Sequence, residues 1–354
     1  MPAQPVNNAQ GFQGDAMLIL SNGLTESADE GFLNVATNLV RRIKNMNPDS
    51  LIVSYEREAD FSDCHLELNK LLLNSGLVSL LRKNRSSFLY IPFPAPMLST
   101  SLRIFILSIF SKMRTNALLV MKGKMNFLAR FILKISGANI IVLSEDSERF
   151  YSDFLGKGRV KMIKAGVDCE KFIPVSDEKS AELKEKYGFN KNKKVVLHVG
   201  HMNEGRNIRQ LLNISPEYQV LLVTSTATKN AQDEKLKHEL MQRKNIRIID
   251  DYIENINEIY QLADIYLFPV IEDGHCIDLP LSCLEAAACG LPVVTTPYGA
   301  MKEFIGKDGF SFIDSFEEIN TLIDNVLKER KANSRASVVD YDWNNAVSTL
   351  LEIK

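Results

Sequence analysis

The stretch of residues 264–303 carries side chains whose types and spacing suit ligand chemistry. An apolar run of strand length ends at Pro269, and a helix that carries Glu285 in its early part follows a polar loop. The acidic and imidazole side chains of that loop are Glu272, Asp273, His275 and Asp278. Strand, loop, helix and strand form the unit of a parallel α/β sheet, which binds ligands at the carboxyl ends of its strands. This loop and Glu285 are therefore a candidate ligand site, although an acid early in a helix also stabilises any helix through its macrodipole.

A second candidate lies in residues 195–207, where a buried-strand pattern runs into Gly200 and a polar loop. We expect a helix to begin near Asn207. Backbone N–H groups at a helix start, together with Arg206, would form an anion site suited to a diphosphate. The alternative is an ordinary capped helix with one solvated arginine. The segment lacks the glycine spacing of a dinucleotide-binding fingerprint.

The elements that must position these residues alternate between strands and helices along the whole chain. Helical spacing of apolar residues from Phe32 to Ile43 predicts an early helix that follows the loop of residues 23–31. A charged connection, residues 168–193, separates two runs of alternation, and we predict two doubly wound halves. The predicted strands fall near residues 16–21, 50–55, 87–92, 117–121, 139–144, 160–165, 194–199, 219–224, 246–250, 264–268, 293–295 and 310–313.

Composition agrees with a globular protein of two domains. The chain has 354 residues, which exceeds one ordinary core, with 45% hydrophobic and 24% charged residues. Its five cysteines form no Cys-x-x-Cys pair, which favours a reducing compartment and argues against a structural zinc site. The first fifteen residues lack Lys and Arg, so we expect no secretory signal, and no apolar run approaches the length of a membrane span.

Four motifs in this order resemble the retaining glycosyltransferases of family 4, the group 1 enzymes of GT-B fold. The motifs are Gly166-Val-Asp with Lys171-Phe172, Gly200-His-Met with Arg206-Asn207, Ala263 to Pro269, and Leu284-Glu-Ala-Ala-Ala-Cys-Gly-Leu-Pro-Val-Val294. The resemblance is dense over residues 160–312 and thinner before them. It implies two Rossmann-like domains that face a central cleft. We expect an acceptor-binding domain at 1–170, a nucleotide-sugar-binding domain at 171–336 and a C-terminal helix at 337–354 that packs back on the first domain.

The resemblance also implies roles for individual residues. Glu285 would bind the donor ribose, Arg206 would hold the donor diphosphate, and His201 stands where many members carry arginine. Tyr252 and Ile253 match the segment whose backbone meets the base. The remaining residues that the resemblance brings to the site are Gly200, Cys276, Ile277, Leu281 and Glu303, with Gly23 and Gly31 in the first-domain loop that faces the diphosphate.

The chain departs from the family pattern in ways that bear on catalysis. The first motif glutamate should stand eight residues before Glu285, where this chain has Ile277. Asp278 would supply the carboxylate if the register were shifted by one residue. Histidine at position 201 is titratable, so its contact with phosphate would weaken as the pH rises above about 6.5. No catalytic base is evident, and catalysis would rest on positioning and on stabilising the departing diphosphate through Arg206, His201 and glycine N–H groups.

No cofactor is implied, because the UDP- or GDP-linked sugar would be a substrate. No metal is implied either, because Arg206 and backbone dipoles can meet the phosphate charge. The only Asp-x-Asp string is Asp340-Tyr-Asp342, which we expect to cap the terminal helix.

An acid-free stretch distinguishes the first half of the chain. The 77 residues between Glu67 and Glu145 contain no Asp or Glu and eleven basic residues, while the other 277 residues have a net charge of −13. Cations with apolar and aromatic neighbours suit an anionic membrane surface. A solvated face over an ordinary core is the alternative, and no nucleic-acid recognition motif is present. The predicted membrane or acceptor patch comprises Arg103, Lys112, Arg114, Lys122, Lys124, Arg130 and Lys134.

Several functions are compatible with these features. The favoured one is transfer of a sugar from a nucleotide donor to a lipid-linked, phosphate-bearing or glycan acceptor in surface glycan assembly, by an enzyme peripheral on the cytoplasmic membrane face. A soluble transferase with a small acceptor and a non-catalytic sugar-nucleotide binder are the alternatives. A GT-B epimerase is less favoured, because its catalytic carboxylates and histidine are not seen. The sequence leaves the sugar, the linkage and the oligomeric state open.

Overall fold

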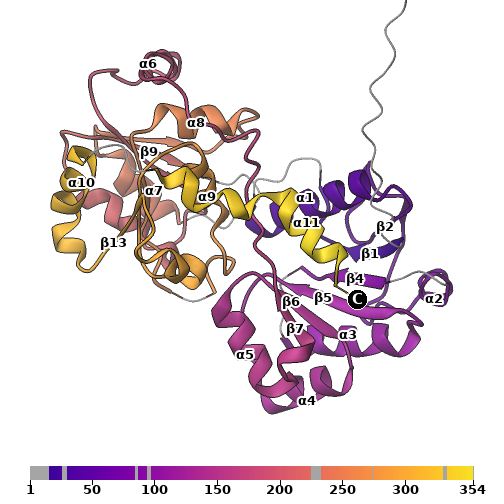
Figure 1. The fold of residues 1–354 in the computed structure, drawn as a ribbon. Helices are drawn as coiled ribbons and strands as arrows, with labels where there is room; N and C mark the ends of the chain where they lie inside the picture. The colour runs from indigo at the N-terminus through magenta and orange to yellow at the C-terminus, as the bar shows by residue number, and fades with distance from the viewer. Residues whose placement is uncertain are drawn as a thin grey trace, which may run out of the picture.

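The structure is a computed structural model that describes residues 16–25, 30–83, 87–93, 97–224, 233–272, 274–329 and 333–353. Within these residues the chain forms two lobes, each built on a parallel β-sheet with helices on its faces (Figure 1). The first sheet has the order β3-β2-β1-β4-β5-β6-β7 and the second has the order β10-β9-β8-β11-β12-β13. This arrangement confirms the predicted pair of doubly wound halves.

The strands of the two sheets match the predicted positions closely. Those of the first sheet are β1 (Met17–Ser21), β2 (Leu51–Ser54), β3 (Cys64–His65), β4 (Ser87–Ile91), β5 (Arg114–Leu119), β6 (Asn139–Val142) and β7 (Val160–Met162). Those of the second are β8 (Val195–Val199), β9 (Gln219–Val223), β10 (Ile246–Ile249), β11 (Ile265–Phe268), β12 (Val293–Thr295) and β13 (Phe310–Phe312). The short edge strand β3 was not predicted, because two residues are too few for a recognisable pattern.

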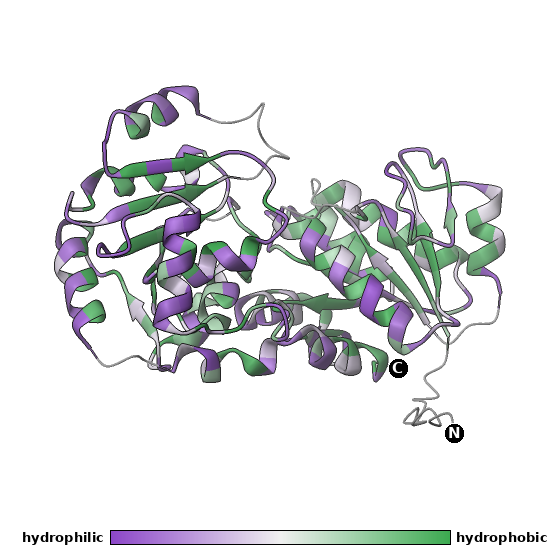
Figure 2. Cartoon of the chain, turned by 90° about the horizontal axis from the view of Figure 1, so that it is seen from above, coloured by the Kyte–Doolittle hydropathy of each residue, from purple (hydrophilic) through white to green (hydrophobic). Residues whose placement is uncertain are grey.

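The strands are continuous apolar runs because helices cover both faces of each sheet. Along β1, Met17 and Ile19 pack in one core cluster while Leu18 and Leu20 pack in the other, on the opposite face of the sheet. Figure 2 shows the strands largely green and the outer sides of many helices purple. The predicted first helix is α1 (Gly31–Met46), which buries its apolar face from Phe32 to Ile43.

The helices fall between the strands as the alternation requires. In the first lobe they are α2 (Ser75–Leu81), α3 (Met97–Phe110), α4 (Phe127–Ile135) and α5 (Glu145–Leu155), after α1. In the second lobe they are α6 (Asp177–Lys186), α7 (Glu234–Met241), α8 (Ile256–Leu262), α9 (Leu281–Ala288) and α10 (Ile319–Lys328). No helix in the described part of the chain has both the length and the apolar character needed to span a bilayer.

The predicted irregular connection, residues 168–193, contains the helix α6 and was wrong in that respect. Ser176 caps this helix by accepting a hydrogen bond from Lys179 N at 3.2 Å. Most residues of this helix are charged and it buries one apolar side chain, Leu183, so hydrophobic periodicity gave no signal. It packs on α8, and Lys184 pairs with Asp264 at 2.6 Å, which attaches the connection to the second lobe.

The C-terminal helix α11 (Trp343–Leu351) returns to the first lobe and packs on α1 (Figure 1). Its N-cap is Asp342, the second carboxylate of the Asp-x-Asp string, which accepts from Asn344 N at 2.8 Å and from Cys169 N at 3.0 Å. Val167 forms an isolated parallel bridge with Asp342. The end of the chain therefore joins the second lobe to the first a second time, beside the crossing at residue 167.

Candidate active site between the two domains

A cavity of about 380 Å³ lies between the two lobes and contains most of the predicted site residues. It is bounded by α1 on the first lobe and by the segments that follow β8, β10 and β11 on the second. The predicted donor-site residues among its lining are Gly31, Gly200, His201, Arg206, Tyr252, Ile253, Cys276, Ile277, Leu281 and Glu285. These residues meet because the carboxyl ends of parallel strands share one edge of the sheet.

The segment after β8 differs from the prediction. Instead of an α-helix near Asn207, two short 3-10 turns cover Glu204–Arg206 and Ile208–Asn213, and Asn207 has a left-handed φ of 54°. Asn203 caps the first turn by accepting from Arg206 N at 3.0 Å. The predicted anion site at an α-helix start is therefore wrong, and a diphosphate site here depends on Arg206 and on loop N–H groups.

Arg206 is held rigidly beside the cavity. The residue is 7% exposed, and its Nε donates to the carbonyl oxygen of His275 at 2.7 Å. A Cβ atom on Gly200 would lie 2.8 Å from Nη1 of Arg206, so only glycine lets the guanidinium approach the backbone this closely. A Cβ on Gly205 would likewise collide with the His275 ring at 2.1 Å. Gly205 therefore allows the loop after β8 to pack against the loop before α9.

The two histidines at the end of β8 have different environments. His201 lines the cavity, and its Nε2 lies 4.0 Å from Oε1 of Glu30 on the first lobe. His198 is fully buried with its Nδ1 2.8 Å from the Leu267 carbonyl oxygen, and burial lowers its pKa to about 4. His198 is therefore neutral at physiological pH, and of the two histidines only His201 lines the cavity.

Glu285 projects from the first turns of α9 into the cavity. The hydroxyl of Tyr260 donates to its Oε2 at 2.6 Å, which fixes the carboxylate. Burial raises the pKa of Glu285, and the Tyr260 hydrogen bond, the charge of Lys171 and the side chain of Asn34 oppose that rise. A carboxylate has about four acceptor positions, so Glu285 can accept from a pair of hydroxyl groups in addition to Tyr260 and Asn34.

The first motif position faces the cavity but carries an apolar side chain. Ile277 lines the cavity, and a Cβ atom on Gly31 would lie 3.4 Å from its Cδ1. This is an ordinary van der Waals distance, so the start of α1 lies against the loop before α9 and a small side chain would fit at position 31. Gly23 is not among the lining residues; a Cβ there would meet the Phe32 ring at 2.0 Å, so this glycine serves packing. Residues 26–29 of the predicted glycine loop lie outside the described residues.

Asp278 and Glu303 join the lobes instead of lining the cavity. The Asp278 carboxylate accepts from Lys122 N at 3.0 Å and from the hydroxyl of Ser147, while its own N–H donates to Val120 O at 2.9 Å. Glu303 accepts from Glu145 N at 2.8 Å. Both carboxylates meet the first turn of α5, where the macrodipole favours negative charge. The structure thus places the proposed shifted-register carboxylate in the domain interface.

Replacing Asp278 with alanine should therefore destabilise the protein more than it affects ligand binding. The change leaves the buried Ser147 hydroxyl without its acceptor and also removes the partner of the more exposed Lys122 N–H, which costs about 1–3 kcal/mol of unfolding free energy. Urea denaturation measures this loss, and calorimetry should find donor affinity within about threefold of the wild type. A tenfold loss of donor affinity at unchanged stability would instead support the shifted-register hypothesis.

The structure adds cavity residues that the sequence reasoning missed. Three of them, Asn34, Asn38 and Arg41, lie at helical spacing on the polar side of α1, and Lys171 and Trp343 approach from elsewhere. Polar residues at i, i+4 and i+7 opposite a buried face were the available signal. Asn34 is within hydrogen-bonding reach of Glu285, so the first lobe helps to orient the carboxylate of the second.

No cluster of three or more His, Cys, Asp or Glu side chains that could hold a metal ion occurs among the described residues.

Comparison with known proteins shows which proteins this chain resembles. Residues 193–329 match the family model of glycosyl transferases group 1. One similar protein is a UDP-Gal:alpha-D-GlcNAc-diphosphoundecaprenol alpha-1,3-galactosyltransferase of Escherichia coli, 26% identical over 60% of this chain and 58% of its own length. The matched regions span between 38% and 58% of the length of the first four curated relatives.

Solved structures match over nearly the whole chain. A glycosyltransferase from Rickettsia africae superposes with a TM-score of 0.75, at 14% identity, over 96% of this chain and 97% of that one. The HepE protein of Anabaena, solved in complex with UDP, superposes with a TM-score of 0.68, at 14% identity and 96% coverage of both chains. The two lobes and their sheets thus form the GT-B fold, and residues 193–329, less than half of the chain, are similar to the group 1 glycosyltransferases.

Proposed function

We propose that the protein is a glycosyltransferase that moves a sugar from a UDP- or GDP-linked donor to an acceptor. The observation that carries this proposal is the gathering of Arg206, Glu285 and Tyr252 around one cavity between two domains of GT-B fold. The solved relative that contains UDP has this fold, which favours a uridine donor.

The lining of the cavity suits the parts of a nucleotide sugar. The base would lie on the Tyr252–Ile253 segment, where the Tyr252 side chain is 54% exposed. The ribose hydroxyls would donate to Glu285, and the diphosphate would lie between Arg206 and the backbone at Gly200. Protonated His201 would add a second positive charge beside the diphosphate.

The reaction that this arrangement supports is displacement at the anomeric carbon. The bond between that carbon and the diphosphate oxygen breaks, and a bond to the acceptor hydroxyl oxygen forms. We propose retention of configuration, with the acceptor proton passing to the departing phosphate oxygen on the same face of the sugar. Arg206 would then stabilise the charge that develops on the diphosphate, so the transition state is favoured without a metal or a separate base.

We propose a membrane-associated acceptor, on the evidence of the surface of α4. The E. coli relative is named for a lipid diphosphate acceptor. In this chain Phe127 is 84% exposed and Phe131 is 50% exposed, with their rings stacked at a centroid distance of 6.5 Å. Leu128 and Ile135 on the same helix are each about half exposed. Exposed aromatic side chains beside cations are typical of proteins that bind membrane surfaces.

The seven predicted patch cations do not form one surface. Lys122, Lys124 and Arg130 line a cavity in the first lobe, and Lys134 is on α4. Arg114 lies at the amino end of β5, away from this cavity, and Lys112 precedes it by two residues. Arg103 donates from Nε to the carbonyl oxygen of Lys70 at 3.1 Å. The cations that suit a membrane are therefore those on and before α4, at the carboxyl edge of the first sheet.

Replacing Phe127 and Phe131 together with serine should weaken binding to anionic vesicles at least tenfold. Two aromatic side chains that enter the interface contribute about 1.5–3 kcal/mol each when fully buried. Co-sedimentation with vesicles of anionic and of neutral lipid measures the effect, and high salt should reverse the wild-type binding. Ile305→Ser, which removes an apolar side chain 62% exposed on the second lobe, is the matched control. Equal binding of wild type and double variant would remove α4 from the proposal.

Release of nucleoside diphosphate from a panel of nucleotide sugars, with and without a lipid phosphate acceptor, tests the proposed function. We expect one donor to be consumed, and consumption to accelerate when an acceptor is present. Donor binding without release for every sugar would instead favour the non-catalytic sugar-nucleotide binder, an outcome to which Ile277 at the first motif position would contribute.

A further inference from the structure

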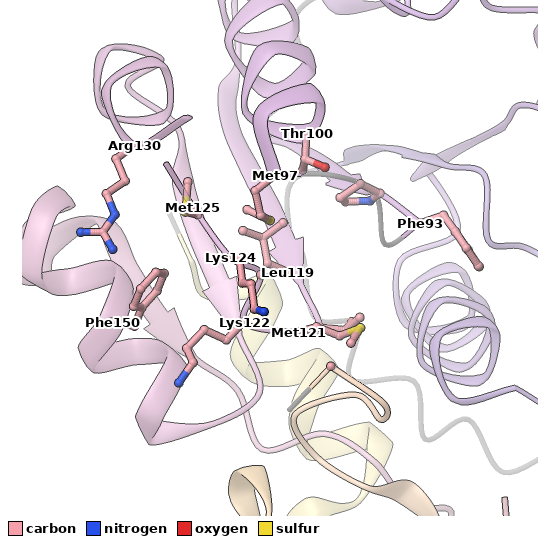
Figure 3. Close-up of a pocket in the computed structure, with 14 residues that line it drawn as sticks. Phe93, Met97, Thr100, Leu119, Met121, Lys122, Lys124, Met125, Arg130 and Phe150 are labelled. Atoms are coloured by element: carbon pink, nitrogen blue, oxygen red, sulfur yellow. The ribbon is translucent and has the colours of Figure 1, made fainter. Parts of the chain in front are cut away.

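The first lobe contains a second and larger cavity, of about 770 Å³, at the carboxyl ends of β4 and β5 (Figure 3). Its volume lies in the range of small-molecule sites, about 300–1,000 Å³. The apolar side chains that form most of its described lining include Met97, Leu119, Val120, Met121, Met125 and Phe150. Methionine side chains are flexible and adapt to an irregular apolar ligand.

Cations line one side of this apolar cavity. Lys122, Lys124 and Arg130 belong to its lining, and its described lining residues include no Asp or Glu. The Arg130 guanidinium lies 5.2 Å from the ring centroid of Phe150, and the Lys122 ammonium lies 6.0 Å from the same ring. Figure 3 shows these two cations on either side of Phe150. The neighbouring Asp278 carboxylate already accepts from the Lys122 N–H and the Ser147 hydroxyl.

One loop connects this cavity with the donor cavity between the lobes. Gly274 lines the cavity of the first lobe, whereas Cys276 and Ile277 line the donor cavity. The same loop is attached to the first lobe, because the Asp278 N–H donates to Val120 O at 2.9 Å. A molecule that occupies the first-lobe cavity is therefore separated from the donor by a single loop.

We propose that this cavity binds the apolar chain of the acceptor next to a phosphate group, which Lys122, Lys124 and Arg130 contact. The ligand class is a lipid phosphate or diphosphate, and the inference rests on the proposed glycosyl transfer. A free sugar would leave its hydroxyl groups without partners against methionine and leucine side chains, which is unfavourable. An apolar chain gains from burial there, and its phosphate gains from three cations. The exposed aromatic rings of α4, which also carries Arg130, would lie where such a chain leaves the membrane.

Calorimetric titration of the full chain with butyl, hexyl, octyl and decyl phosphate, each below its micelle concentration, tests the proposal. Each methylene that enters the cavity should strengthen binding, by about tenfold for every two methylenes until the cavity is full. Inorganic phosphate lacks the alkyl chain and decanol lacks the phosphate, so each should bind at least tenfold more weakly than decyl phosphate. Affinity that does not depend on chain length, or decanol binding as tightly as decyl phosphate, would overturn the proposal.

Variants locate the binding in this cavity. Met121→Trp and Met125→Trp each fill it from a partly exposed position, and either should reduce decyl phosphate affinity at least tenfold. Arg130→Gln should reduce it several-fold, whereas Lys157→Gln, which removes an exposed cation of the same lobe outside the lining, should not. If both filling variants keep wild-type melting temperature and affinity, the cavity is not the site. Nucleotide-sugar titration of the same variants separates the two proposals: unchanged donor binding with no alkyl phosphate binding would refute only this one.

Discussion

Replacing Arg206 with alanine should lower kcat for glycosyl transfer about a hundredfold to a thousandfold, the loss typical of removing one preorganised charge-stabilising donor. Arg206 is 7% exposed and its Nε donates to His275 O at 2.7 Å, so little reorganisation is needed as charge develops on the diphosphate. The Michaelis constant should also rise, because the ground-state diphosphate is contacted as well. Steady-state kinetics with the preferred donor measure both effects.

Two variants control for the loss of charge and of fold. Arg206→Lys keeps the charge without the planar fork, so it should recover part of the lost turnover. Arg209→Ala removes an arginine three residues later that is 45% exposed and paired with Glu239, and it should leave kcat unchanged. If the Arg206→Ala variant raised only the Michaelis constant, the arginine would contribute uniform binding and no transition-state stabilisation.

Replacing Glu285 with alanine should weaken nucleotide-sugar binding about tenfold to a hundredfold and leave the fold intact. A hydrogen bond to a charged group contributes about 1.5–3 kcal/mol. Tyr260→Phe, which removes the 2.6 Å hydrogen bond that fixes the carboxylate, should cause a smaller loss in the same calorimetric titration. Unchanged affinity of the Glu285→Ala variant for every donor that the wild type binds would disprove the assignment to the ribose.

The Glu285 contact also predicts a pH dependence. Burial raises the pKa of this carboxyl group above its ordinary value of 4.5, and the ribose hydroxyls need the ionised form as acceptor. Donor affinity should therefore be complete well above that raised pKa and fall as the pH decreases through it, sooner than for an ordinary glutamate. Glu285→Gln, which cannot ionise, should show none of this dependence.

The fold was predicted well because it depends on apolar runs and helical periodicity, which can be recognised in a single sequence. Continuous apolar runs such as β1 and β11 indicate strands that helices cover on both faces. The apolar residues of α1 recur at helical spacing, which predicts one of these helices. The helix α6 escaped prediction because only Leu183 among its apolar residues is buried, and its position depends on Lys184 meeting Asp264, far along the chain.

The site was predicted less completely, for physical reasons. A motif shows which residue type stands at a position, but the neighbours of its side chain depend on how the lobes pack. Asp278 and Ile277 are adjacent, yet the isoleucine faces the donor cavity and the carboxylate reaches Ser147 on the other lobe. The acid-free stretch showed where cations are concentrated in the sequence, but only the fold separates Arg114, at the amino end of β5, from Lys122 and Arg130 beyond its carboxyl end.

Calorimetric titration of the wild type, Arg206→Ala, Glu285→Ala and Arg209→Ala with UDP- and GDP-linked sugars tests most directly whether the cavity between the lobes is a donor site. We predict that at least one nucleotide sugar binds the wild type with a stoichiometry of one. Its affinity should fall tenfold or more in the Glu285→Ala variant, and should fall in Arg206→Ala but remain unchanged in Arg209→Ala. Absence of binding by every donor in the panel, or equal affinity in all four proteins, would contradict the account.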